Sequence, residues 1–131
     1  MGIRAVGYCR ANDTPSAQQE LRQQQERIHA YCCQHHLTLE HIYMDAGVSG
    51  LHLRRKELQT LLTHAAKGQF DVVVVCDTKR LSRRLVDLYK IQNILRECNV
   101  ALALCYDDRQ TAFLSEEGRL QEYSKNESNE K

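Results

Sequence analysis

An apolar run at residues 72–76 constrains the fold of this chain more than any other segment. The run follows Asp71 and is mostly valine, a β-branched residue that favours strands. A strand without alternating polar residues is typical of a parallel sheet covered on both faces. The sequence therefore predicts that this strand lies deep inside an α/β domain.

Other segments of apolar and β-branched residues alternate along the chain with longer segments of helical period. Strands are expected near residues 4–10, 38–44, 71–76 and 100–106, and helices near residues 16–35, 56–67 and 85–97. In the last helix Leu88, Ile91, Ile94 and Leu95 are expected to face inward, and the glutamine-rich patch at residues 18–25 is expected on an exposed helix surface. The predicted fold is α/β with three layers, in which helices flank a mainly parallel four-stranded sheet.

The length and charge of the chain indicate one domain without a strong basic field. The chain has 131 residues, which fits a single domain. We expect a folded unit at residues 1–118 and a polar, disordered tail at residues 119–131. The net charge is +1, from 18 basic and 17 acidic residues, so only local clusters at residues 54–56 and 79–84 favour binding to an anion such as DNA.

Six cysteines occur without a secretory leader and without a CxxC pair. They are expected to be reduced thiols in a cytoplasmic protein. Four of them lie in or beside apolar segments, where free cysteine packs as a small hydrophobe: Cys9, Cys76, Cys98 and Cys105. No apolar run approaches the roughly 20 residues that span a bilayer, so no membrane segment is expected.

Three motifs with polar residues end or follow predicted strands. The first is Gly7-Tyr-Cys-Arg-Ala-Asn12, the second is Asp45-Ala-Gly-Val-Ser-Gly50 with Arg55 behind it, and the third is Arg80-Leu-Ser-Arg83. Functional loops of an open parallel sheet lie at the carboxyl ends of the strands. The three motifs are therefore expected to converge on one crevice.

Together these motifs resemble, in one register over roughly residues 3 to 108, the N-terminal catalytic domain of serine recombinases, the resolvase/invertase family. In that family a serine hydroxyl attacks a DNA phosphate and forms a transient phosphoserine bond, without a metal or other cofactor. The resemblance implies that phosphate and DNA would be bound at the positions of the family's arginines, Arg10, Arg55, Arg80 and Arg83. It assigns supporting roles to Tyr8, Asp45, Ser49 and Lys79.

Two positions depart from the family pattern. The nucleophile position is Asn12, and Lys79 stands where the family usually has aspartate. An amide is not a useful nucleophile, because its nitrogen lone pair is delocalised into the carbonyl. We therefore expect a pseudoenzyme of a DNA-recombination or mobile-element system that binds DNA phosphates or regulates an intact recombinase. It is expected to bind DNA weakly, because it offers phosphate contacts but no recognition helix. It is expected to be a monomer or weak homodimer, since the family's long dimerisation helix has no counterpart after Gly118.

Two other functions stay open at this point. Ser16 or Thr14 could act as a relocated nucleophile of an active recombinase domain, although Ser16 is better explained as the start of a helix. Alternatively, the chain could be a cytosolic α/β protein that binds another phosphate ligand.

Several of the same residues also have structural explanations. Tyr8 could simply pack over the sheet, Asp45 could cap the helix predicted from residue 56, and Ser49 could belong to an ordinary turn. Arg80 and Arg83 could form surface ion pairs with Asp77 and Asp87. A cluster of histidines and cysteines is spread around one helix and is not assigned as a metal site: His29, Cys32, Cys33, His35 and His36.

Overall fold

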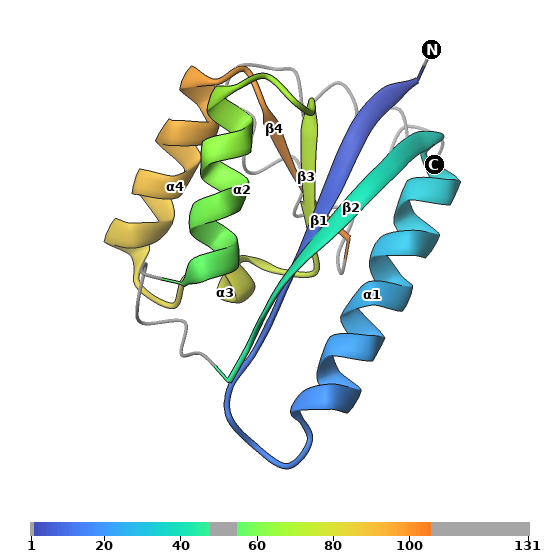
Figure 1. Ribbon diagram of the computed structural model, residues 1–131, viewed down its shortest axis with the longest axis vertical. Coiled ribbons are helices and arrows are strands. Elements are labelled where there is room, and N and C mark those ends of the chain that lie inside the picture. The colour runs from blue at the N-terminus through green and yellow to red at the C-terminus, as the bar shows by residue number, and fades with distance from the viewer. Residues whose placement is uncertain (1, 48–54, 106–131) are drawn as a thin grey trace, which may run out of the picture.

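The computed structural model describes residues 2–47 and 55–105. Its centre is one sheet of four strands in the order β2-β1-β3-β4, and every neighbouring pair is parallel (Figure 1). The strands are β1 (Ile3–Ala11), β2 (Leu37–Ala46), β3 (Val72–Val75) and β4 (Ala101–Leu104). The predicted α/β fold with a four-stranded parallel sheet is confirmed.

Helices cover both faces of the sheet. Figure 1 shows α1 (Ala17–Gln34) on one face, and α2 (Lys56–Ala66) and α4 (Leu85–Glu97) side by side on the other. A single helical turn, α3 (Thr78–Leu81), follows β3 and packs against β1. Sequence analysis did not predict α3, because one turn is too short to show a helical apolar period.

The valines of β3 divide the apolar core into two layers. Val73 and Val75 lie in the cluster under α2 and α4, whereas Val72 and Val74 lie in the cluster under α1. All four are buried. The position predicted for this strand, central and covered on both faces, is therefore confirmed.

The packing of α1 on the sheet depends on Gly7 in β1. A Cβ atom at this position would lie 2.9 Å from Cγ2 of Ile28, closer than real Cβ contacts allow. Ile28 is itself fully buried. The glycine therefore lets α1 approach the middle of β1 closely.

Two expectations about helix faces were wrong. Ile94 is 39% exposed, and the inward face of α4 consists of Leu88, Ile91 and Leu95. The turn of the helix carries position 94 about 100° away from Leu95, and so off that face. In the glutamine-rich patch Gln24 is buried, because it continues the spacing set by Leu21 and Ile28.

The pairing of β1 with β2 contains an irregularity. Ala5 pairs with Leu39 but Val6 pairs with His41, so Glu40 is an extra residue in β2. Leu39 before this bulge packs in the α1 cluster, and Tyr43 after it packs in the cluster under α2. Beyond the bulge the backbone of Arg10 in β1 lies opposite that of Asp45 in β2 in the strand register.

Ser49, the last residue of the strand expected at 100–106, and the boundary between domain and tail lie outside the described residues. Within residues 2–47 and 55–105, no helix combines the length and the apolar character needed to cross a membrane.

Candidate functional site

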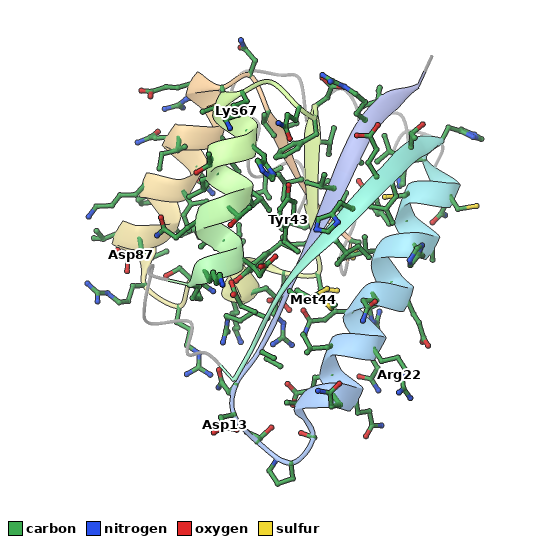
Figure 2. All side chains as sticks on the ribbon, viewed as in Figure 1. Asp13, Arg22, Tyr43, Met44, Lys67 and Asp87 are labelled. Carbon is green, nitrogen blue, oxygen red and sulfur yellow. The ribbon has the colours of Figure 1, made fainter. Side chains whose placement is uncertain are left out.

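The three motifs meet at the carboxyl ends of β1, β2 and β3. Arg10 lies near the end of β1 and Asn12 follows that strand, Asp45 lies near the end of β2, and α3 begins three residues after the last residue of β3. In Figure 2 two labelled residues, Asp13 after β1 and Asp87 at the start of α4, lie toward this end of the molecule. The hydrogen bonds described below join described residues of the three motifs, so the motifs lie together at this end of the sheet.

The guanidinium of Arg10 is buried and directed into the protein. Its Nη1 donates to Oδ1 of Asn12 at 2.6 Å, its Nη2 to the carbonyl of Lys79 at 2.9 Å, and its Nε to the carbonyl of Arg80 at 3.2 Å. The side chain therefore connects the end of β1 to α3. It also holds the amide oxygen of Asn12.

Arg55 approaches the same turn from the start of α2. Its Nη1 donates to the carbonyl of Arg80 at 2.9 Å, and its Nη2 donates to the carbonyl of Leu81. Its guanidinium carbon lies 5.6 Å from the centre of the Tyr8 ring, within the range of a cation–π contact. Arg10 and Arg55 together thus donate hydrogen bonds to the carbonyls at the carboxyl end of α3, where the helix dipole is negative.

Gln24 of α1 fixes the backbone beneath this cluster. Its Oε1 accepts from the amide of Arg10 at 3.0 Å, and its Nε2 donates to the carbonyl of Arg10 at 2.9 Å. Nη1 of Arg80 donates to that same carbonyl at 3.2 Å. Sequence analysis missed Gln24, although its place on the apolar stripe of α1 was a signal that could have identified it.

Asp45 connects β1, β2 and α2. Its Oδ2 accepts from the Tyr8 hydroxyl at 2.7 Å and from the amide of Leu58 at 3.1 Å, while Oδ1 accepts from the amide of Glu57 at 3.0 Å. These amides belong to the first turn of α2, which has no side-chain cap from Arg55. Asp45 therefore caps α2 from a neighbouring strand, in agreement with the structural explanation of this residue.

Burial changes the ionisation of the groups beneath the site. It is the largest cause that raises the pKa of Tyr8 above its ordinary value, and the bond to Asp45 acts in the same direction against the charge of Arg55. Burial also lowers the pKa of Arg10, and the neighbouring cations Arg55, Arg80 and Arg83 lower it further. Arginine stays charged at neutral pH, so these cations form a positive cluster.

The outer side chains of the third motif are more accessible. Nε of Arg80 lies 3.9 Å from Oδ1 of Asp77, which agrees with the ion pair expected there. Asp87 pairs with Arg84 at 3.4 Å, and not with Arg83 as the structural explanation would have it. Arg84 stands three residues before Asp87 at the start of α4, where an i,i+3 pair can form. Arg83 and Lys79 are exposed.

The two alternative hydroxyl nucleophiles lie at the start of α1. Ser16 Oγ donates to Oε2 of Glu20 at 3.0 Å and lies 3.3 Å from Oγ1 of Thr14. Ser16 is the residue before α1 but makes no side-chain cap there. Among the described residues, no group of histidine, cysteine and acidic side chains is arranged to hold a metal ion.

Comparison with known proteins gives a consistent result. Residues 5–126 match the family model described as "Resolvase, N terminal domain". No curated protein sequence matches the chain.

Several solved structures share the fold. The C-terminal catalytic domain of ISC1926 TnpA, an IS607-like serine recombinase, is 24% identical with a TM-score of 0.73, over 79% of this chain and 71% of that one. The N-terminal catalytic domain of TP901-1 integrase is 22% identical with a TM-score of 0.72, over 94% and 97%. A resolvase family site-specific recombinase from Streptococcus pneumoniae is 19% identical with a TM-score of 0.70, over 97% and 93%.

Proposed function

Because the chain belongs to the family of resolvase N-terminal domains, we propose that it acts in cytoplasmic DNA recombination as a phosphate-binding or regulatory module that does not cleave DNA. Its partners in this role are DNA and an intact recombinase. The observation that carries the proposal is the residue at the nucleophile position, Asn12.

The surroundings of Asn12 support a binding role. The side chain is half-buried, and its Oδ1 accepts a short hydrogen bond from Arg10. An amide can donate and accept hydrogen bonds, but it cannot form the reversible phosphate ester that a hydroxyl forms. Asn12 is therefore suited to orient Arg10 or a phosphate oxygen rather than to attack phosphorus.

The neighbouring cations support binding of a phosphate. Lys79 and Arg83 are exposed beside the buried cluster. Arg80 lies between them in the sequence and is partly exposed, and guanidinium groups bind phosphate oxygens through charge-assisted hydrogen bonds. Contacts to phosphate carry no sequence information, so we expect DNA binding that depends on salt and shows little sequence preference.

The decisive experiment is covalent trapping on a nicked suicide DNA substrate, in which a cleaving recombinase stays attached through its nucleophile. The unmodified chain is expected to give no adduct. Asn12→Ser alone is also expected to give none, because Lys79 places a cation where the family has a carboxylate. Asn12→Ser combined with Lys79→Asp tests whether these two departures together account for the loss.

An adduct with the unmodified chain would overturn the proposal. Peptide mapping would then locate the attached residue, and Ser16→Ala and Thr14→Val would show whether one of these hydroxyls has replaced the nucleophile.

A second experiment tests the phosphate site separately from cleavage. Inorganic phosphate is titrated into the labelled protein and followed by NMR. The amides near Arg10 and Arg80 are expected to shift first. Shifts spread evenly over all basic residues would indicate only ionic screening and would contradict a phosphate site.

A further inference from the structure

Two free cysteines lie beneath the site on neighbouring strands. Cys76 directly follows β3 and Cys105 directly follows β4, and their sulfur atoms are 3.6 Å apart. The strand register pairs Val75 with Leu104, and the amide of Cys105 donates to the carbonyl of Val75 at 2.8 Å. The two cysteines are therefore the next opposed positions of the ladder.

This placement suits a covalent bond between the two sulfurs. Neighbouring strands lie about 4.7–4.9 Å apart, and disulfides join residues whose Cα atoms are about 4.4–6.8 Å apart. A disulfide needs a sulfur separation of about 2.05 Å, which small side-chain rotations could reach from the observed contact. Cys76 is buried and Cys105 is half-buried, so the pair has one side near solvent.

We propose that Cys76 and Cys105 are a redox modification site, which hydrogen peroxide converts reversibly into a disulfide. In the first step the Cys76 thiolate attacks one peroxide oxygen and the O–O bond breaks. Cys76 becomes a sulfenic acid, and the hydroxide that leaves takes up a proton to form water. In the second step the Cys105 sulfur attacks the Cys76 sulfur, and the S–O bond of the sulfenic acid breaks. The hydroxide that leaves takes up the proton of the Cys105 thiol and forms a second water. Two thiols and one peroxide thus give one disulfide and two waters.

The ionisation of the pair agrees with this order. The S–H of Cys105 donates to the sulfur of Cys76, and this hydrogen bond is the main cause that lowers the pKa of Cys76. The same contact, together with burial, raises the pKa of Cys105. A thiolate is the reactive form toward peroxide.

Oxidation of Cys76 would affect the hydrogen bonds around Arg10. The Cys76 sulfur also donates to the backbone carbonyl of Gln24 at 3.8 Å, and the Gln24 side chain holds the backbone of Arg10. Cys76 is followed by Asp77 and then by α3. Closing the sulfur pair would therefore shift the segment that leads into α3.

The test uses the full chain, treated with peroxide and then with an alkylating reagent before tryptic digestion. Cleavage after lysine and arginine places Cys76 in peptide 68–79 and Cys105 in peptide 97–109, which also contains Cys98. The expected product is a cross-link between these two peptides that a reductant reverses. Cys98→Ser and Cys33→Ser are matched controls that should retain the cross-link, whereas Cys105→Ser should abolish it.

A second readout protects the test against variants that fold poorly. In the unmodified chain, NMR amide signals of α3 should move on oxidation and return on reduction, and in Cys105→Ala they should not move. Peroxide that oxidises the exposed Cys33 while leaving peptides 68–79 and 97–109 unlinked would overturn the proposal. So would a cross-link that forms through Cys98, or one that forms only after unfolding in urea.

Discussion

Four basic residues of the site form two pairs with different surroundings. Arg10 and Arg55 are 2% and 1% exposed, and their guanidiniums donate to backbone carbonyls of α3. Lys79 and Arg83 are exposed on and after that same helical turn. All four cations lie close to one strand edge, but the first pair holds the protein together and the second pair faces solvent.

This difference shows that a match to a family motif does not by itself define a role. A four-residue helix is too short to be stable alone, because nucleating a helix costs more than one turn returns. Arg10 and Arg55 stabilise α3 through its terminal carbonyls. The buried arginines therefore build the platform on which the exposed cations are displayed.

The strongest test of this comparison is Arg55→Met. It removes the bonds to the carbonyls of Arg80 and Leu81 and the contact with Tyr8. Leaving buried polar groups unpaired should lower the free energy of unfolding by about 3 kcal/mol. Urea unfolding should show this loss, while the matched change Arg83→Met should stay within about 0.5 kcal/mol of the parent. Equal losses would end the distinction between the two groups.

A somewhat smaller loss is expected for Asp45→Asn. The substitution puts an amide NH2 where the carboxylate accepts from the Tyr8 hydroxyl and from two amides of α2. We expect a loss of about 2 kcal/mol in unfolding free energy. A double-mutant cycle with Tyr8→Phe should show coupling between the two side chains, and strict additivity would mean that their hydrogen bond contributes nothing.

The buried Tyr8 hydroxyl should also make the free energy of unfolding decrease at alkaline pH. The folded pKa of Tyr8 is raised, so its neutral form is favoured in the fold. Its contribution is complete below the unfolded pKa of about 10 and decreases above it by up to about 1.4 kcal/mol per pH unit. Between pH 9 and 11 the free energy of unfolding should therefore fall less steeply with pH in Tyr8→Phe than in the parent protein.

Two buried thiols also contribute to the pH dependence of the free energy of unfolding in that experiment. Burial raises the pKa of Cys9 to about 12 and that of Cys32 to about 11, which has the same sign of effect. Both thiols are present in the parent and in Tyr8→Phe, so only the difference between the two proteins reports Tyr8. Identical slopes would contradict the role of its burial.

The smallest change in stability, with a clear change in binding, is expected for Arg83→Met. If Arg83 neutralises one DNA phosphate, its loss should reduce the slope of log K against log salt by about 0.9. Fluorescence anisotropy with a short duplex at several salt concentrations measures this slope. Arg22→Met, a change at an exposed arginine of α1 away from the motifs, is the control and should leave the slope unchanged.

Much of the fold could be predicted from local patterns, whereas the roles at the site depended on contacts between distant residues. The apolar run of β3 and the spacing of the three main helices placed these elements correctly. Glu57 and Leu58 carry no sequence sign that Asp45 of another strand holds their amides. The short α3 likewise exists through contacts made by Arg10 and Arg55, which lie 69 and 26 residues away.

The bulge at Glu40 sets the phase of β2. Side chains alternate between the two faces of a strand. A bulge leaves one residue out of this alternation, so odd-numbered positions lie on one face before Glu40 and on the other face after it. If β2 kept Glu40 but alternated without the bulge, Asp45 would share the orientation of Leu37 and Leu39 and would point toward α1 instead of Tyr8. The first half of β2 therefore packs against the buried face of α1, while the second half places a carboxylate on the opposite side of the sheet. Regular alternation through Glu40, with no change in composition at the site, would turn Asp45 away from both Tyr8 and the amides of α2.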